Sequence, residues 1–489
     1  MSPDAGVERL SASRPLRDDG AEMRPILEEA LEAALRFLAG SAEAPAVGFE
    51  RERPACDDVL PETGSGAIRA LDAYLSRYGE HHGRSTGPRY FGFVTGGVTP
   101  AALAADWLVS TFDQNVATER HSIAAAVENR ALQWIADLLG LPEGRFHGVF
   151  TTGATAANLV CLASAREWCG ERQGLHHARD GFAEPAAVRV FGAAPHSSIL
   201  KVMGILGMGQ GRVQRVASLP GREAVDVAAL ERALATCEAP GRIVVASAGT
   251  VDTGDFDDLR AVADLCRTHG AWMHVDGAFG AFARCSPAYA DLAAGIEEAD
   301  SITLDGHKWL NVPYDCGIAL TRHPLLNERA FSVEAPYVPA DGVMPSFMNR
   351  GIEQSRRFRA LPVFLTLAAY GRAGHREVVE RNCGFARALC DWIDGGDLFE
   401  TVAETRLNVV AFKGRWLAGA DGGALDRAFV RKLNQSGRCF VTPSTYKGAF
   451  VVRLAVANWR TGEDDLEIVK NALIEAHTAT APAMKEERT

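Results

Sequence analysis

SITLDGHKWL, residues 301–310, joins a short apolar run to a cluster of ionisable side chains. The run at residues 302–304 predicts a buried strand, and Asp305, His307 and Lys308 follow directly at its carboxyl end. Ligands of open α/β sheets bind at the carboxyl ends of the strands, so a lysine here is placed to react. A lone lysine after a strand is nevertheless most often an exposed surface residue. The interpretation of Lys308 therefore depends on what other strand ends offer.

Two upstream segments repeat this pattern of a strand followed by polar or small residues. In WMHVDGAFG, residues 272–280, an apolar run opens onto the carboxylate of Asp276. In GVFTTGATAANLVCLASAR, residues 148–166, a strand leads through a Thr/Gly/Ala turn into a helix. Helix N-termini bind anions, so Ala154 and Thr155 are candidates to hold a phosphate by backbone N–H and hydroxyl donation. The alternative is an N-capping turn without a ligand.

A phosphate site, an acid for a ring nitrogen and a lysine for a Schiff base are what pyridoxal 5'-phosphate (PLP) requires. Taken together, these motifs are highly specific, and the chain resembles the PLP-dependent amino acid decarboxylases of the aromatic-L-amino-acid, tyrosine and glutamate decarboxylase branch. The resemblance covers about residues 87–467. It is carried by RYFGF (89–93), TTGATAANL (151–159), HSSILK (196–201), HVDGAFG (274–280), DGHKWLNVPYDCG (305–317) and SRRFRAL (355–361).

The resemblance implies an α/β protein with the type-I fold of PLP-dependent transferases. We expect a mostly parallel sheet in a large PLP-binding domain, residues 91–371, and a smaller C-terminal α/β domain, residues 372–489. Residues 1–90 are expected to form a tail and a helical segment that packs on a partner subunit, giving a homodimer with a composite active site. From spacing alone, the helical pattern at residues 23–38 indicates only that this segment needs something to pack on.

The resemblance also implies roles for three catalytic residues. Lys308 binds the cofactor covalently, His196 stacks on its ring and helps position the substrate carboxylate, and Asp276 keeps the ring nitrogen protonated. A carboxylate about 4 Å from that nitrogen, at an effective dielectric near 20, contributes roughly 4 kcal/mol, or about three pK units. The protonated ring then acts as the electron sink.

Other site residues follow from the same resemblance. Further cofactor contacts are implied for Thr250, Ala278 and His307. The segment RYFGFVTGG, residues 89–97, is expected to line the substrate pocket through Phe91, Phe93 and Gly96, although a core-packed strand and turn would read equally well. Val251 stands where the family commonly has a second threonine. Asp305 and Gly306 replace the Asn-Pro of some relatives, and an acid near a phosphate is unfavourable unless it turns away or accepts a backbone hydrogen bond.

Residues 334–353, EAPYVPADGVMPSFMNRGIE, are rich in Pro and Gly and predict a lid loop. In the family the corresponding loop reaches over the active site, often that of the partner subunit, and carries a tyrosine linked to protonating the substrate carbon after carbon dioxide leaves. Tyr337 is the only tyrosine in the loop, but Phe347 lies nearer the expected position. If Phe347 takes that position, protonation is impaired and the product becomes an aldehyde formed with oxygen.

Composition agrees with a cytoplasmic enzyme of 489 residues. A net charge of −11 argues against nucleic acid or an anionic membrane as the main partner. Ten cysteines without a CxxC pair favour reduced thiols, and no targeting segment is apparent. No metal site is expected. Arg356, Arg357 and Arg359 are interpreted as a solvated face or a set of ion pairs.

The sequence therefore predicts PLP-dependent decarboxylation of an L-amino acid to its amine, with an aromatic substrate favoured and glutamate or short diamino acids still open. An oxidative decarboxylase (aldehyde synthase) and an aminotransferase remain alternatives with the same cofactor. A catalytically silent relative is a further alternative, against which the intact Lys308, Asp276 and His196 argue. A nucleotide-binding oxidoreductase is disfavoured, because the GxGxxG spacing in GILGMGQG, residues 204–211, fails at Arg212.

Overall fold

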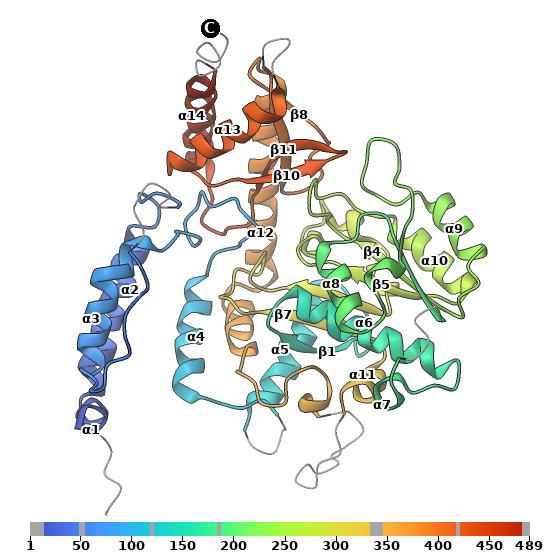
Figure 1. The fold of residues 1–489 in the computed structure, drawn as a ribbon, viewed down its shortest axis with the longest axis horizontal. Coiled ribbons are helices and arrows are strands. Elements are labelled where there is room, and N and C mark those ends of the chain that lie inside the picture. Colours follow the sequence, from blue (N-terminus) through green and yellow to red (C-terminus); the bar gives the residue numbers. More distant parts are fainter. Residues whose placement is uncertain are drawn as a thin grey trace, which may run out of the picture.

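The computed structural model describes residues 14–47, 54–117, 122–182, 187–332, 346–416 and 421–481. Seven strands form the main sheet in the order β1-β7-β6-β5-β4-β2-β3 (Figure 1). They are β1 (His147–Thr151), β2 (Val188–Gly192), β3 (Val213–Arg215), β4 (Gly241–Ser247), β5 (Trp272–Asp276), β6 (Ser301–Asp305) and β7 (Gly317–Thr321). All run in the same direction except β7, which is antiparallel to both of its neighbours. This arrangement confirms the predicted mostly parallel sheet.

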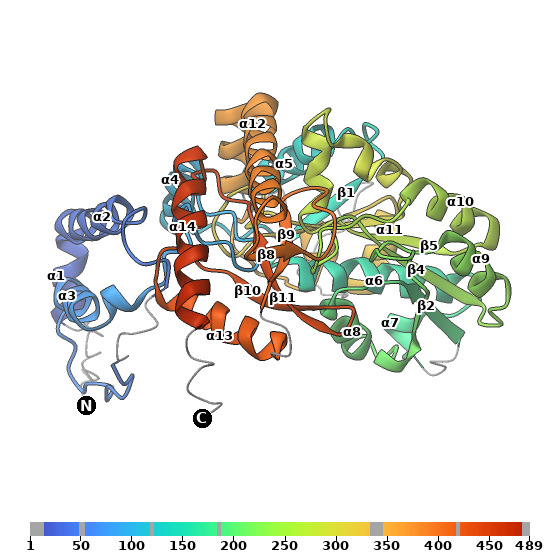
Figure 2. The same ribbon diagram turned by 90° about the horizontal axis from the view of Figure 1, so that it is seen from above.

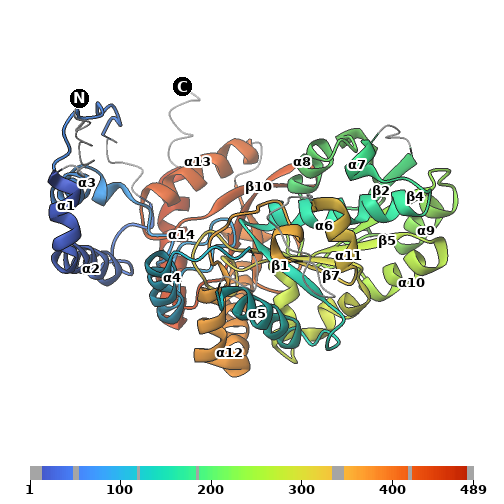
Figure 3. The same ribbon diagram turned by 90° about the horizontal axis from the view of Figure 1, so that it is seen from below.

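Helices cover both faces of this sheet. They are α5 (Ala124–Leu138), α6 (Ala154–Glu171), α7 (His177–Asp180), α8 (Ser197–Ile205), α9 (Val227–Ala235), α10 (Leu259–His269) and α11 (Pro324–Phe331). In β4, Ile243 and Val245 pack with residues of α6 and α8, whereas Val244 and Ala246 belong to the core cluster that includes α10. Figure 3 shows α6 and α8 on one side of the strands and α10 on the other. Strands covered on both faces read as continuous apolar runs, as the sequence had indicated.

A second, antiparallel sheet forms the small domain in the order β10-β11-β9-β8. Its strands are β8 (Phe399–Thr401), β9 (Val409–Gly414), β10 (Thr442–Tyr446) and β11 (Ala449–Ala455), and α13 (Gly422–Gln435) and α14 (Glu463–Thr480) pack beside them. The segment at residues 89–91 joins this domain, because the N–H of Phe91 donates to the carbonyl of Phe440 at 2.8 Å. Residues early in the chain thus complete a domain built late in it.

The long helix α12 (Ala360–Asp394) links the two domains. Gly371 interrupts it with φ +55° and ψ −167°, a conformation essentially reserved for glycine. Residues of α12 up to Cys383 still pack in the main core, and those from Phe385 onward pack in the core of the small domain. The helix therefore carries the connection between the cores, and a domain division at residue 371 stays a prediction.

The N-terminal helices stand apart from both domains (Figures 1 and 2). They are α1 (Arg14–Ala21), α2 (Met23–Ala39) and α3 (Ala67–Tyr78), followed after a loop by α4 (Pro100–Phe112). Neither α2 nor α3 buries a residue, and α2 exposes Leu27, Leu31 and Leu35. In the part of the chain that the structure describes, no helix has the length and apolar character needed to cross a membrane.

Candidate active site

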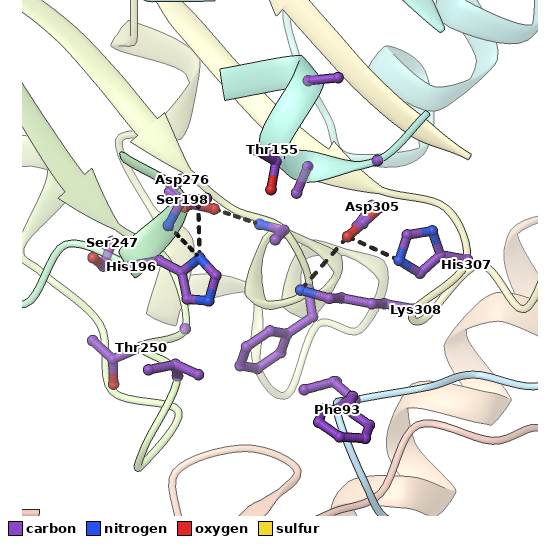
Figure 4. A pocket seen from close by; sticks show the side chains of 18 of the residues that line it. Phe93, Thr155, His196, Ser198, Ser247, Thr250, Asp276, Asp305, His307 and Lys308 are labelled. Carbon is purple, nitrogen blue, oxygen red and sulfur yellow. Dashed lines mark hydrogen bonds and ion pairs between the residues drawn. The ribbon is translucent and has the colours of Figure 1, made fainter. Parts of the chain in front are cut away.

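A cavity of about 390 Å³ lies at the carboxyl ends of β4, β5 and β6 (Figure 4). It brings together every residue that the sequence predicted to contact the cofactor: Ala154, Thr155, His196, Thr250, Asp276, Ala278, His307 and Lys308. The strands place these side chains at one edge because their carboxyl ends meet there. Residues separated by more than 150 positions in the sequence thus converge on a single site.

The first turn of α6 forms one wall of the cavity. The helix begins at Ala154, directly after the loop that follows β1, and both Ala154 and Thr155 line the cavity. Free N–H groups and the dipole of an 18-residue helix favour an anion at this end. The neighbouring strand must come close to the loop, since a Cβ on Gly317 would lie 2.3 Å from the carbonyl carbon of Gly153. The geometry suits a phosphate.

Asp276 ends β5 and is only 9% exposed. Its Oδ1 accepts a hydrogen bond from the N–H of Ala278 at 3.3 Å, and its Oδ2 accepts one from Nδ2 of Asn158 at 3.3 Å. Two donors stabilise the ionised carboxylate. Asp276 can therefore face a ring nitrogen as a fixed negative charge.

His196 caps the N-terminus of α8, and its ring points into the cavity. Its Nδ1 lies 2.8 Å from Oγ of Ser198 and accepts from the N–H of Ser198 at 3.2 Å. Burial lowers the pKa of His196, and the charge of Lys308 acts in the same direction, while Asp276 opposes both. The imidazole is consequently neutral near pH 7.

Lys308 and His307 share one carboxylate. Oδ2 of Asp305 lies 3.1 Å from Nε2 of His307 and 3.7 Å from Nζ of Lys308. The acid that the sequence placed near the phosphate thus turns toward these two side chains. Oδ1 of Asp305 and Nδ1 of His307 are buried without a hydrogen-bond partner among the described residues. A ligand in the cavity can satisfy such atoms.

Only one of the three predicted substrate contacts lines the cavity. Phe93 lies there with 60% of its surface exposed. Phe91 instead packs in the core of the small domain, 5.7 Å from the ring of Phe385, because its backbone pairs with Phe440. Gly96 lies against the backbone of Lys308, where a Cβ would come within 1.7 Å of the carbonyl oxygen. The predictions for Phe91 and Gly96 as pocket residues are wrong.

The lid prediction is only partly described by the structure. Tyr337 lies outside the described residues. Phe347 is 1% exposed, does not line the cavity, and lies below the guanidinium groups of Arg350 at 4.1 Å and Arg356 at 5.2 Å. Phe347 thus does not line the cavity of its own chain, and its effect on protonation stays a prediction. Its ring is a packing element beside the buried ion pair between Arg356 and Glu128.

Of the other residues that the sequence singled out, two line the cavity and three form ion pairs. Thr250 lines the cavity, but its hydroxyl donates to Oε2 of Glu223. Val251, which replaces a second threonine, also lines the cavity. The three arginines of SRRFRAL form ion pairs, as one of the two interpretations expected: Arg356 with Glu128, Arg357 with Asp106 and Arg359 with Asp315.

Sequence reasoning missed Arg453, which reaches the cavity from β11 of the small domain. Its side chain is 5% exposed, and its Nε has no hydrogen-bond partner among the described residues. Burial lowers the pKa of Arg453 to about 10, so the guanidinium remains charged at neutral pH. The carboxylates of Asp252 and Glu223 act against this lowering, and an anion bound in the cavity would compensate the buried charge further. No local motif marks this residue, because its importance arises from domain packing.

Comparison with known proteins agrees with this geometry. The family model of the pyridoxal-dependent decarboxylase conserved domain matches residues 78–415. An L-2,4-diaminobutyrate decarboxylase of Rhizobium meliloti (strain 1021) is 30% identical over 93% of this chain and 92% of its own length. The chain belongs to the pyridoxal-dependent decarboxylase family. An aromatic-L-amino-acid decarboxylase of Bacillus atrophaeus is 28% identical over 87% of this chain and 89% of its own.

Solved structures place the decarboxylase in the type-I fold. Oryza sativa TDC with PLP superposes with a TM-score of 0.83 at 25% identity, covering 96% of this chain and 100% of that one. Rhodiola rosea 4-hydroxyphenylacetaldehyde synthase superposes with a TM-score of 0.83 at 20% identity, covering 94% and 99%. The enzyme is a PLP-dependent carboxy-lyase acting on an amino acid, and its residues fit the cofactor. A helix N-terminus, the carboxylate of Asp276 and the amine of Lys308 match the phosphate, ring nitrogen and aldehyde of PLP.

Proposed function

We propose that the decarboxylase removes the α-carboxyl group of an aromatic L-amino acid and releases the amine and carbon dioxide. The observation that carries this choice is the aromatic wall of the cavity, to which Phe93 and Phe279 contribute. The ring of Phe93 is 60% exposed and that of Phe279 is 3% exposed, and aromatic rings that line a cavity favour stacking with an aromatic substrate. The similarity to the aromatic-L-amino-acid decarboxylase of Bacillus atrophaeus supports the same substrate class.

The charged groups of the cavity also favour an uncharged substrate side chain. Among the described lining residues, Asp276 and Asp305 are the carboxylates, and both already have partners. A diamino acid would need a further carboxylate for its second ammonium group. Glutamate would need a second cation beside Arg453, because Lys308 is reserved for the cofactor. An aromatic substrate makes neither demand.

The cofactor and four residues have proposed roles in the reaction. When bound, PLP supplies the electron sink for the electrons that carbon dioxide leaves behind. Lys308 provides the amine that holds the cofactor and, once the substrate amine replaces it, can return a proton to the substrate carbon. Asp276 keeps the ring nitrogen protonated, and His196 covers the ring. Tyr337 of the lid remains a second candidate for the proton donor.

Arg453 is proposed to bind the α-carboxylate of the substrate. Its guanidinium stays charged while buried, and its Nε lacks a partner among the described residues. Arginine offers a planar fork of donors that matches a carboxylate. With PLP bound, a carboxylate held by Arg453 would be oriented for cleavage of its bond to the substrate carbon, as decarboxylation rather than transamination requires.

The protein is further proposed to be a homodimer with a composite active site, located in the cytoplasm. Leu27, Leu31 and Leu35 of α2 are exposed in the described part of the chain, and Phe93 is 60% exposed at the cavity. Tyr314, which stacks on His307 at 4.1 Å, is 58% exposed. A second copy that covers both regions would bury this surface and close the cavity.

An oxygen-consuming aldehyde synthase is the second candidate, and the likeness to the Rhodiola rosea synthase keeps it relevant. Its main argument in the sequence was Phe347. Because that ring is buried under Arg350 and Arg356, it gives no reason to expect failed protonation. The amine is therefore the proposed product.

A product assay tests the proposal. PLP-loaded protein is incubated with L-tryptophan, L-tyrosine, L-phenylalanine, L-glutamate and L-2,4-diaminobutyrate, and amine, aldehyde and keto acid are quantified by mass spectrometry. We expect an amine from an aromatic substrate and none from the Lys308→Ala variant. Preferred turnover of glutamate or diaminobutyrate would overturn the substrate class. An aldehyde accompanied by hydrogen peroxide would favour the synthase, and a keto acid an aminotransferase.

A further inference from the structure

A chain of buried hydrogen bonds runs beneath the cavity, between β5, β6 and α6. Nε1 of Trp272 donates to Oγ of Ser301 at 3.0 Å, and the same oxygen lies 2.9 Å from Nδ1 of His274. Nε2 of His274 lies 2.9 Å from Oδ1 of Asn158. All four side chains are fully buried. Side chains alternate along a strand, so Trp272, His274 and Asp276 all face α6.

At Asn158 this series of hydrogen bonds divides into two branches, one to Asp276 and one to Ser198. Its Nδ2 donates to Oδ2 of Asp276 at 3.3 Å and to Oγ of Ser198 at 3.1 Å. Oγ of Ser198 in turn lies 2.8 Å from Nδ1 of His196. One side-chain amide therefore contacts the acid that faces the ring nitrogen and, through Ser198, the histidine that covers the ring.

The direction of these bonds follows from the chemistry at the Asp276 end. The carboxylate of Asp276 can only accept, which requires the amide nitrogen of Asn158 on its side. Oδ1 of Asn158 then faces His274, so Nε2 of that ring carries the proton and donates to it. In a neutral ring Nδ1 is then the acceptor for the hydroxyl of Ser301. The indole of Trp272 donates to the same hydroxyl, which is compatible with this direction but does not fix it.

The same logic reaches His196. The hydroxyl of Ser198 accepts from Asn158 and can give its proton to Nδ1 of His196, where the backbone N–H of Ser198 also donates. Nδ1 is thus an acceptor, and Nε2 carries the proton on the cavity side. Burial lowers the pKa of His274 to about 4, which agrees with the neutral ring that this pattern needs.

We propose that Asn158 is a positioning residue that fixes the side chain of Asp276 directly and that of His196 through Ser198. The Nε2–H of His274 orients the amide of Asn158 for this role. Because His274 occupies the amide oxygen, Asn158 cannot rotate and present that oxygen to Asp276. The carboxylate therefore always meets a donor and is held in a fixed place. His196 meanwhile presents an N–H donor to the cavity, and does not act as a base there. This inference rests on the proposed roles of Asp276 and His196.

The tautomers provide a test that is independent of turnover. PLP-loaded protein is labelled with [15N]histidine, and long-range 1H–15N spectra are recorded at pH 7.5, with signals assigned by His196→Gln and His274→Gln. We expect both rings to be neutral with the proton on Nε2. A proton on Nδ1 of His274 would reverse the bond to Asn158 and overturn the proposal.

Kinetics then test the positioning role. Asn158→Ala should lower kcat about 10- to 100-fold, the loss expected when a charged acceptor loses one hydrogen bond, with KM changed much less. His274→Gln keeps an N–H donor and should retain more activity than His274→Leu, which has none. Equal activities of the two His274 variants, or a kcat of Asn158→Ala within about twofold of wild type, would overturn the inference.

A control separates positioning from general destabilisation. Asn434 is a buried asparagine of the small domain that does not line the cavity. Its amide donates to the carbonyl of Val441 and accepts from the N–H of the same residue. Asn434→Ala should lower the melting temperature without lowering kcat of the folded protein. Asp276→Asn isolates the proposed function: if it is fully active, the role of Asp276 fails whatever tautomers the spectra show.

Discussion

Among the lining residues that the structure describes, Arg453 is the one through which the small domain adds a charge to a cavity that the large domain otherwise builds. It lies on β11, whereas the lysine, the acid and the phosphate cradle belong to the large domain. A charge that enters from the other domain depends on how the two domains pack. Substitution of Arg453 therefore tests the proposed binding of the substrate carboxylate.

We predict that Arg453→Gln weakens the binding of amino acids much more than the binding of their methyl esters. The ester lacks the negative charge that the guanidinium is proposed to hold, and a charged hydrogen bond of this kind is worth about 10- to 100-fold in affinity. Dissociation constants of acid and ester are measured from the absorbance change of the PLP-loaded enzyme. Arg438→Gln, which removes an exposed arginine paired with Glu475, is the control. An unchanged preference for the acid would contradict the prediction.

The residues that the sequence located well share a simple property. Lys308, Asp276 and Thr155 each follow an apolar run within a few positions, so local sequence marks the end of a strand and topology does the rest. Phe91 and Gly96 failed because their segment crosses from the small domain to the backbone of Lys308. A motif that crosses between domains gives no local sign of which side chain enters the cavity.

At the scale of elements, one face of β5 carries both Asp276, which lines the cavity, and His274, which contacts Asn158 beneath it. Trp272, His274 and Asp276 alternate with Met273 and Val275, which pack in the main core. The period of two in WMHVD was visible in the sequence and could have placed His274 on the face of Asp276. The partner of His274 could not be predicted, because Asn158 comes from α6 and the contact depends on how that helix packs on the sheet.

Helix α12 contains a buried histidine that should make stability depend on pH. His375 is 7% exposed, its Nε2 lacks a partner among the described residues, and burial lowers its pKa to about 4. In the unfolded chain the pKa is near 6.5, so between pH 6.5 and 4 unfolding takes up a proton. The free energy of unfolding of the wild type is therefore unaffected by this titration above pH 6.5 and decreases as the pH falls from 6.5 towards 4.

We therefore predict that His375→Gln gains stability relative to wild type on acidification. From the two pKa values the relative gain between pH 8 and pH 5 is about 2 kcal/mol. Urea unfolding of both proteins at pH 8, 7, 6 and 5 gives the difference in the free energy of unfolding. His82→Gln replaces an exposed histidine and serves as the control. A difference that stays constant with pH would show that His375 does not titrate as described.

At the scale of the whole molecule, the two domains and the N-terminal helices have different reasons for their positions. Each domain closes around its own core, and α12 connects the two. The family resemblance led us to expect a large and a small domain, and the boundary at residue 371 stays a prediction because α12 contributes to both cores. The placement of α1–α3 is different, since these helices rest on neither core (Figure 2). Their position makes sense if a second subunit supplies the missing surface.

Substitution on α2 should therefore dissociate the enzyme and inactivate it together. Leu31 and Leu35, one turn apart and both exposed in the single chain, would be buried in the proposed homodimer. We predict that Leu31→Asp combined with Leu35→Asp shifts the sedimentation coefficient from dimer to monomer, because two buried charges without partners cost several kcal/mol. Turnover should fall with the dimer fraction, since Phe93 and Tyr314 would lose the surface that closes the cavity. Leu175→Asp, at another exposed leucine, should leave both properties unchanged. A monomeric wild type, or a double variant that stays dimeric and active, would mean that α2 packs on something other than a second copy of this chain.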